Sequence, residues 1–195
     1  MTADLSWEVS DFSALDNWSA SSDASASLTG RPRRLTLSMD GPSSGVGRII
    51  SDVLTTHDSL GVFGITFKDV SYTGIDGDHK VGIGLREINA GDFIWQPTGG
   101  DPAIAYYNND DGSDYFTTAS SNDGTADSIS DVEWGGNHDI TIEWDGIDAR
   151  LLIDGVLQSS LSHSESADYR PVIETNSAGG NGDTIEVGGV IVEKL

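Results

Sequence analysis

The sequence contains no cysteine, and basic residues are scarce among its 195 residues. Without cysteine the chain has no disulfide framework, no thiolate nucleophile and no cysteine-ligated zinc or iron–sulfur centre. Ten Lys and Arg residues stand against 32 Asp and Glu residues, which gives a formal net charge of −22. Nucleic-acid binding needs cationic side chains that neutralise phosphates, and a negative field repels the polyanion. We therefore expect no nucleic-acid partner.

Long apolar runs are also missing. A membrane-spanning helix needs about 18 consecutive apolar residues, and no such stretch occurs in the sequence. The first residues show neither the basic segment nor the apolar segment of a secretory signal. We expect no membrane insertion and no signal peptide, so the protein is predicted to be made in the cytoplasm. The length fits a single domain over residues 1–195.

The acidic excess consists mainly of aspartate. The sequence has 24 Asp and 8 Glu residues against 7 Arg and 3 Lys residues. This preference for short carboxylates over long lysine stems resembles the composition of proteins from halophiles that accumulate salt. At molar salt the Debye length falls to about 3 Å, so repulsion within the chain is largely screened. The composition therefore predicts a halophilic source, and an acidic protein from a low-salt cell, such as a calcium-rich adhesin, is the alternative.

Apolar and polar residues alternate along much of the chain. This period of two predicts β-strands that are buried on one face. The alternating sets include Leu35, Leu37 and Met39; Phe63, Ile65 and Phe67; Val81, Ile83 and Leu85; and Ile140, Ile142 and Trp144. Asp-Gly pairs between such segments, as at 145–146 and 154–155, predict tight hairpin turns.

Two segments depart from simple alternation. Residues 46–54 have apolar spacing that suits a helix, but β-branched residues dominate, which favours a strand. Near the end of the chain, three residues separate Val187 from Val190, where two would keep the buried face in phase. A β-bulge at Gly188-Gly189 would restore the phase. Taken together, the patterns predict an all-β protein, an antiparallel β-sandwich of about 12 short strands in two sheets.

Residues 137–157 carry a more specific resemblance. A strand containing His138 and Trp144 is followed by a second strand that ends at Asp154-Gly155. This pair resembles the hairpin of the concanavalin A-like lectin/glucanase (laminin G-like) superfamily, and segments 11–18 and 184–194 are similar to its opening and closing strands. The resemblance implies a jelly roll whose concave sheet and connecting loops carry any ligand.

Catalytic motifs are poorly matched. Retaining glycosidases of this superfamily place two carboxylates about 5 to 5.5 Å apart on one strand. Only Glu143 and Asp145, running on to Asp148, approach that pattern, and Asp145 is needed for the predicted turn. Residues 41–45 match the Gly-x-Ser-x-Gly string, but no βαβ units surround Ser43, so a loop is predicted instead of a nucleophile. We therefore predict no catalytic residue.

The candidate binding residues fall into two sets. Clustered oxygen ligands around a glycine turn are typical of Ca²⁺ sites, although the EF-hand register is absent and a hydrated hairpin tip is the alternative. The candidate cation ligands are Asn108, Asp110, Asp111 and Asp114. Aromatic faces bind the apolar surface of sugars, with Asn or Asp contacting hydroxyls. The candidate glycan-binding residues are Trp95, Tyr107, Asn109, Tyr115 and Trp134. Because neighbouring residues of a strand point to opposite faces, one of Tyr106 and Tyr107 is expected in the core.

The expected function is that of a non-catalytic, lectin-like binding or structural module. We expect a virion surface protein, such as a head decoration, a spike or a part of a tail fibre, of a virus that infects a halophilic archaeon. Such a protein would reach the outside of the cell by lysis. Its expected partners are other virion or surface proteins, extracellular glycans and copies of itself in a homo-oligomer. The alternatives are a glycoside hydrolase or polysaccharide lyase of the same fold, a purely structural shell protein, and a cytoplasmic location.

The acidic composition predicts that stability depends on salt. In dilute buffer the repulsion among carboxylates is not screened, so we expect the cooperative unfolding transition to be lost below about 0.5 M monovalent salt. Thermal unfolding followed by circular dichroism, from dilute buffer to about 3 M KCl, checks this expectation. A melting curve that stays unchanged over that range would contradict the halophilic interpretation.

Overall fold

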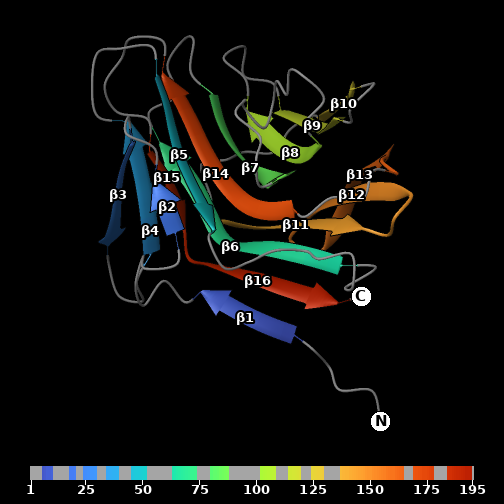
Figure 1. Ribbon diagram of the computed structural model, residues 1–195, viewed down its shortest axis with the longest axis horizontal. Coiled ribbons are helices and arrows are strands. Elements are labelled where there is room, and N and C mark those ends of the chain that lie inside the picture. The colour runs from blue at the N-terminus through green and yellow to red at the C-terminus, as the bar shows by residue number, and fades with distance from the viewer. Residues whose placement is uncertain are drawn as a thin grey trace.

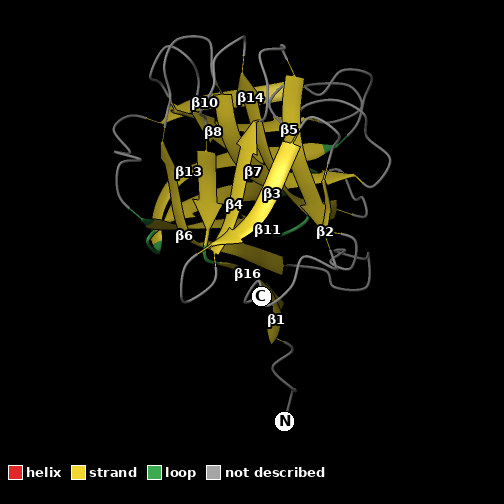
Figure 2. Cartoon of the chain, turned by 90° about the vertical axis from the view of Figure 1, so that its left-hand side faces the viewer, coloured by secondary structure: helices red, strands yellow, loops and turns green. Residues whose placement is uncertain are grey.

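The computed structural model describes the strands and several connections of the chain. The described ranges are 6–10, 18–20, 24–29, 34–39, 45–51, 63–73, 80–87, 102–108, 114–119, 124–129, 137–164, 169–177 and 184–194. Within them sixteen strands form two sheets in which every pairing is antiparallel (Figure 1). The described elements are strands and connecting loops (Figure 2), and none of them is a helix long and apolar enough to cross a membrane. The predicted antiparallel β-sandwich is confirmed.

The larger sheet has nine strands. They are β1 (Ser6–Ser10), β3 (Ala24–Thr29), β4 (Arg34–Met39), β6 (Phe63–Thr73), β11 (His138–Trp144), β12 (Asp148–Ile153), β13 (Val156–Ser162), β15 (Thr184–Val187) and β16 (Gly189–Lys194). Their order is β13-β12-β11-β6-β15-β4-β3, and β16 pairs with both β6 and β1. The long strand β6 therefore has β11 along one edge and β15 followed by β16 along the other.

The smaller sheet has seven strands. They are β2 (Trp18–Ala20), β5 (Gly45–Ser51), β7 (Lys80–Glu87), β8 (Ala103–Asn108), β9 (Asp114–Ala119), β10 (Gly124–Ile129) and β14 (Tyr169–Ser177). Their order is β10-β9-β8-β7-β14-β5-β2, so β7 and β14 lie near the middle of the sheet. The strand predicted within 46–54 is confirmed up to Ser51, and residues 52–54 lie outside the described ranges.

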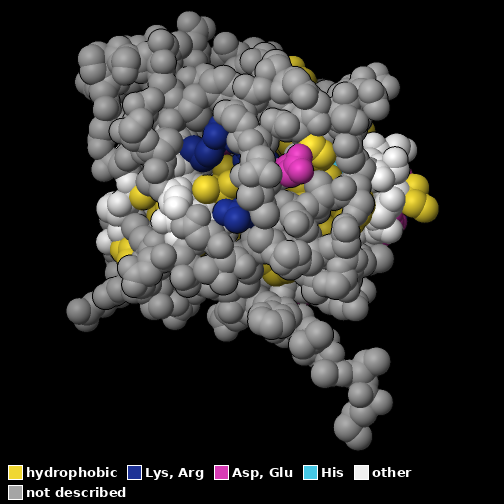
Figure 3. Space-filling view, in the orientation of Figure 1, with side chains coloured by type: hydrophobic (Ala, Val, Ile, Leu, Met, Phe, Trp, Pro, Cys, Tyr) yellow, Lys and Arg dark blue, Asp and Glu magenta, His cyan; other side chains and the backbone are white. Residues whose placement is uncertain are grey.

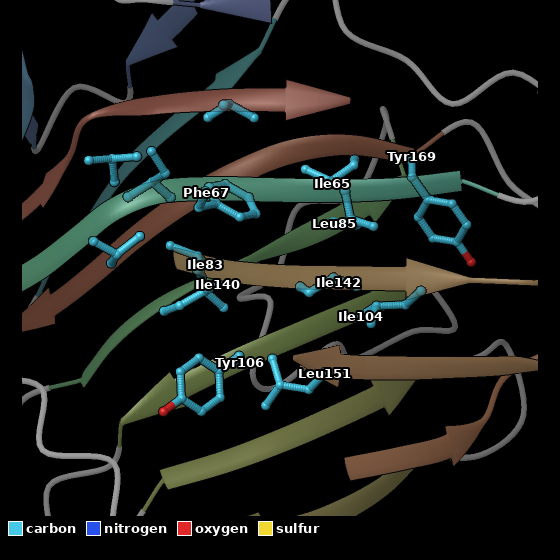
Figure 4. Packing of buried hydrophobic residues seen from close by; sticks show 14 of the residues in the cluster. Ile65, Phe67, Ile83, Leu85, Ile104, Tyr106, Ile140, Ile142, Leu151 and Tyr169 are labelled. Atoms are coloured by element: carbon cyan, nitrogen blue, oxygen red, sulfur yellow. The ribbon is translucent and has the colours of Figure 1, made fainter. Parts of the chain in front are cut away.

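The core lies between the two sheets and contains the residues that the alternation placed on one face. Figure 4 shows Ile65 and Phe67 of β6 packed with Ile83 and Leu85 of β7, and all four are fully buried. Trp18 and Trp144 are also in this cluster. Burying a large apolar side chain contributes about 1.5–3 kcal/mol. Interdigitated apolar faces therefore hold the two sheets together.

A bulge keeps the apolar residues of β6, β15 and β16 in phase. Strand β15 ends at Val187 and β16 begins at Gly189, with buried side chains on both sides of the break, so the predicted irregularity is confirmed. Opposite the break, Asp69 has a positive φ of 49°. The N–H of Gly188 donates to the carbonyl oxygen of Lys68 at 2.8 Å. Such breaks divide long segments into shorter strands, which partly explains why sixteen are seen where about twelve were expected.

Gly84, in the middle of β7, has no room for a side chain. A Cβ placed there would overlap the carbonyl oxygen of Ile104 and lie 2.9 Å from the Cα of Ala105, both backbone atoms of the neighbouring strand β8. We predict that Gly84→Ala lowers the free energy of unfolding by about 1–3 kcal/mol, because the strands must move apart. Denaturant unfolding at constant high salt measures the change.

Ser160→Ala, at an exposed position on β13, serves as the matched control and should leave the free energy of unfolding nearly unchanged. Equal unfolding midpoints for Gly84→Ala and the unchanged protein would show that β7 and β8 do not approach this closely.

Candidate functional site

The seven-stranded sheet presents half of its side chains away from the core. On β14, Tyr169 and Ile173 belong to the core cluster. The residues between and beyond them therefore lie on the opposite side of the sheet. The same alternation holds along β5, β7, β8 and β9. We call this side the outer face; it comprises Arg48, Ile50, Gly82, Gly84, Arg86, Ala103, Ala105, Tyr107, Tyr115, Arg170, Val172 and Glu174.

Small residues occupy the middle of the outer face. In the strand register, Val172 of β14 is opposite Gly84 of β7, which is opposite Ala105 of β8. Val172 and Ala105 are fully buried and form a second, small apolar cluster against which Ile50 and Tyr107 pack. Gly84 contributes no side chain to this row, and Gly82 contributes none to the next row, between Glu174 and Tyr107. The middle of the face is therefore flat and apolar.

An aromatic pair lies in the next cross-strand row, on the β8–β9 side of Gly82. Tyr107 of β8 and Tyr115 of β9 are directly opposite each other, and their rings stack with centroids 5.5 Å apart and planes inclined by 24°. Both side chains are partly buried, while Tyr106 is fully buried in the core, so the prediction that one of the neighbouring tyrosines is a core residue is confirmed. Two of the sequence-predicted glycan-binding residues thus meet on the outer face.

A charged cluster begins on the other side of Gly82, where Glu174 of β14 is opposite Arg48 of β5. The Oε1 atom of Glu174 is 2.5 Å from Nε of Arg48 and 3.5 Å from Nη1 of Arg86. The Glu174 side chain is 0% exposed and that of Arg86 is 2% exposed. A charge buried this deeply needs an opposite charge beside it, which the cluster provides. Figure 3 shows basic and apolar side chains gathered over β5 and β14.

The sequence did not reveal this cluster. The cluster combines three strands that are far apart along the chain, which contribute Arg48, Arg86 and Glu174. None of these residues belongs to a sequence motif. The available signal was indirect. Gly82 and Gly84 alternate with apolar residues in β7, and Glu174 directly follows the apolar residues 171–173 in β14.

The remaining predicted glycan-binding residues, Trp95, Asn109 and Trp134, lie outside the described ranges. Their role therefore stays a prediction.

The predicted cation site is only partly described. Asp110 and Asp111 lie outside the described ranges, as does the side chain of Asn108. Asp114 is 4% exposed, and its Oδ2 accepts a hydrogen bond from the Tyr106 hydroxyl at 3.2 Å. Burial raises the pKa of Tyr72, and the charge of Asp114 adds to this effect. In the part of the chain that is described, no group of three or more His, Asp or Glu side chains could hold a metal ion.

Asp145 forms the turn that the sequence predicted between β11 and β12. Its Oδ1 atom accepts hydrogen bonds from the N–H groups of Ile147 and Asp148 at 3.0 and 2.8 Å. Its Oδ2 atom is 2.5 Å from Nη2 of Arg150. The backbone hydrogen bonds and, to a lesser extent, Arg150 lower the pKa of Asp145. A carboxylate held ionised in this way is suited to shaping a turn and cannot serve as a general acid.

The neighbouring carboxylate of Glu143 is also placed away from the outer face. Glu143 lies on β11 of the nine-stranded sheet, opposite Arg150 in the register, and its Oε2 is 4.0 Å from Nη1 of that residue. Two of the candidate carboxylates of the enzymatic alternative, Glu143 and Asp145, therefore contact one exposed arginine.

A chain of polar contacts joins the second Asp-Gly turn to the bulge of β6. The Asp154 carboxylate contacts Nδ1 of His138 at 2.7 Å and accepts the N–H of Asp139 at 2.9 Å, and these bonds lower the pKa of Asp154. The Asp139 carboxylate in turn contacts Nζ of Lys68 at 2.6 Å and accepts the N–H of Asp69 at 3.0 Å. These acidic residues therefore stabilise backbone geometry.

The two antiparallel sheets and their order define the class of the fold, a jelly-roll β-sandwich. No family model matches the chain. No curated protein sequence matches it either. The chain is similar to solved structures. Those described next are all far below 25% identical to it in sequence, so the similarity concerns the fold alone.

Both lectin domains and glycanases are among these structures. The carbohydrate recognition domain of Emp46p, in its potassium-bound form, has a TM-score of 0.64 at 14% identity, covering 95% of this chain and 92% of that chain. A glycoside hydrolase family 16 endo-glucanase from Bacteroides ovatus has a TM-score of 0.68 at 11% identity, with coverages of 95% and 98%. The Bacillus licheniformis β-glucanase has a TM-score of 0.66 at 12% identity, with coverages of 100% and 99%.

The lowered pKa of Asp145 predicts a contribution to acid stability. In the unfolded chain the carboxyl titrates near 3.8, whereas in the folded protein the pKa is lower. The stabilisation is therefore fully present above the unfolded value and is lost as the pH falls through the folded value. We expect Asp145→Asn to be less stable than the unchanged protein at neutral pH and to lose less stability between about pH 5 and pH 2.

Denaturant unfolding at a series of pH values measures this difference. Glu193→Gln removes one negative charge at an exposed position of β16 and should leave the pH dependence unchanged. Stability curves that run parallel for Asp145→Asn and the unchanged protein would show that the turn does not depend on the ionised carboxylate.

Proposed function

We propose that this protein is a non-catalytic glycan-binding module and that the outer face of its seven-stranded sheet is the binding surface. The observation that carries the proposal is the stacked pair of Tyr107 and Tyr115, which lies beside a flat row of glycine, alanine and valine. Sugars present an apolar face of C–H groups to aromatic rings and hydroxyl groups to polar side chains. The tyrosines and the partly exposed Arg48 offer both kinds of contact on one surface.

The solved structures of similar fold support a carbohydrate ligand. They include a carbohydrate recognition domain, an endo-glucanase in complex with G4G3G-2F-DNP and a transglycosylase in complex with NAG. The last of these has a TM-score of 0.65 at 15% identity.

The charge arrangement supports binding without catalysis. Glycoside hydrolysis by retention needs two carboxyl groups about 5 to 5.5 Å apart, one of them protonated at working pH. Among the side chains described on the outer face, Glu174 is the one carboxylate, and two arginines hold it. No described side chain of this face supplies the second carboxyl group.

A glycoside hydrolase of the same fold is the second candidate, because the endo-glucanase and the β-glucanase cover nearly the whole chain. Incubation with a panel of polysaccharides in molar salt separates the two. The proposed module releases no reducing ends, whereas release that is abolished by Glu143→Gln or Glu174→Gln would establish an enzyme.

We further propose a setting for the module, on the surface of a virion that infects a halophilic archaeon. The support is the Asp-rich composition with its net charge of −22, together with a fold suited to surface display. In this setting the domain repeats as a homo-oligomer beside other virion proteins, and repetition strengthens weak glycan contacts. Co-purification of the protein with virus particles tests this setting, and its recovery with a cellular fraction alone would contradict it.

The aromatic pair provides the direct test of the glycan site. A glycan array probed at about 3 M KCl identifies the ligand, and calorimetry gives its affinity. We expect Tyr115→Ala to weaken binding by up to about tenfold, because one side of the stacking platform is lost. Ile147→Ala removes an exposed apolar side chain from the β11–β12 turn and should leave the affinity unchanged. Absence of binding to every glycan on the array would overturn the proposed function.

A further inference from the structure

One edge of the nine-stranded sheet exposes large apolar side chains. Strand β13 is the last strand in the order of this sheet, and within the described ranges it pairs with β12 alone (Figure 1). Three large apolar side chains of the described part are exposed, and two of them, Val156 at 61% and Leu157 at 56%, begin this strand. In the register Leu157 is opposite Leu152 of β12, which is half-buried. The edge therefore begins with an apolar corner.

Strand β13 also lacks the features that keep an edge strand from adding a further strand. Natural edge strands commonly carry a lysine, another charged residue or a proline, which blocks pairing with the backbone N–H and C=O groups along the edge. The seven residues of β13, VLQSSLS, include neither a charged residue nor a proline. The strand is therefore suited to pairing with another chain.

The open part of the edge is its first five residues. Four of these five side chains are exposed: Val156, Leu157, Gln158 and Ser160. At the far end of the strand, the hydroxyl of Thr118 on β9 of the smaller sheet donates to the carbonyl oxygen of Ser162 at 3.4 Å. The smaller sheet therefore approaches β13 at that end. Five residues is an ordinary strand length, so the open part is long enough to pair.

We propose that β13 pairs antiparallel with β13 of a second copy of this chain about a two-fold axis, which joins the two nine-stranded sheets edge to edge. Identical strands complement each other in this arrangement, because each supplies the donors and acceptors that the other needs. The contact also covers the apolar corner of both copies. The inference does not depend on the glycan site, and it assigns a surface to the homo-oligomer proposed above.

Charge favours a second copy over a foreign peptide as the occupant. The net charge of the chain is −22, so two copies repel each other over most of their surface. Close contact between them needs a segment without carboxylates, and β13 is such a segment. A basic peptide would instead bind where acidic side chains meet it. The composition of β13 therefore suits a copy of the same chain.

The proposed dimer is weak and depends on concentration. One pair of strands buries less surface than a permanent dimer does. Molar salt screens the repulsion between the copies. At about 3 M KCl we expect a monomer–dimer equilibrium with a Kd on the order of 10 µM. Sedimentation equilibrium with the full chain, from about 1 to about 200 µM protein, measures it.

The same substitution on two edges of one sheet locates the interface. Ser160 of β13 and Ser27 of β3 are both exposed, and β3 ends the nine-stranded sheet on its other side. Ser160→Lys should raise the Kd at least about tenfold, because a charge on the paired edge must lose its water. Ser27→Lys makes the same change of charge and should leave the Kd unchanged.

A second pair of variants tests the apolar corner. Leu157→Ser should raise the Kd about tenfold, because it removes apolar surface that the dimer covers. Ile147→Ser removes a similar side chain, 69% exposed in the β11–β12 turn, and should leave the Kd unchanged. Circular dichroism in the same buffer verifies that each variant is folded.

Two outcomes contradict the inference. A monomer at every concentration would overturn it, as would a dimer whose Kd responds equally to Ser160→Lys and Ser27→Lys. Glycan binding is measured separately, so the two proposals fail independently. A monomer that binds a glycan overturns the dimer alone, whereas a β13-dependent dimer that binds no glycan overturns the proposed function alone.

Discussion

The packing of alternate side chains between two antiparallel sheets is the constraint on which the rest of the structure depends. Each strand has a period of two, so a residue placed in the core fixes the side of the sheet on which its neighbours lie. Ile83 and Ile173 are fully buried between the sheets. Their burial is what directs Gly82 and Glu174 to the outer face. The core therefore positions the candidate site without contributing any residue to it.

The bulge beside Asp69 shows how strictly this constraint acts. One extra residue in β6 would turn every later side chain to the wrong face, and the break at Gly188 compensates for it on the neighbouring strands. A Cβ on Gly188 would lie 3.0 Å from the Cβ of Asp69, so the two irregularities fit closely together. Acidic residues at this place, Asp139 and Asp154, hold backbone N–H groups. Part of the negative charge of the chain thus has a structural role.

The architecture could be predicted from the sequence because its determinants are local. Alternation gave the buried faces, and the Asp-Gly pairs gave the turns at Asp145 and Asp154, where Gly146 and Gly155 adopt positive φ. Tyr107 and Tyr115 were predicted from their aromatic type and their position next to polar loops. The charged half of the site could not be predicted in this way, because Arg48 and Glu174 are separated by 126 residues. Only the order of strands β5, β14 and β7 brings such residues together.

The central claim is that the outer face of the seven-stranded sheet binds the saccharide. The most direct measurement is an NMR titration of backbone amides with an oligosaccharide that the protein binds, in molar salt. The account predicts that chemical shifts change at Arg48, Gly82, Tyr107 and Tyr115, with little change around Arg150. Changes confined to strands β11–β13 of the nine-stranded sheet would contradict it.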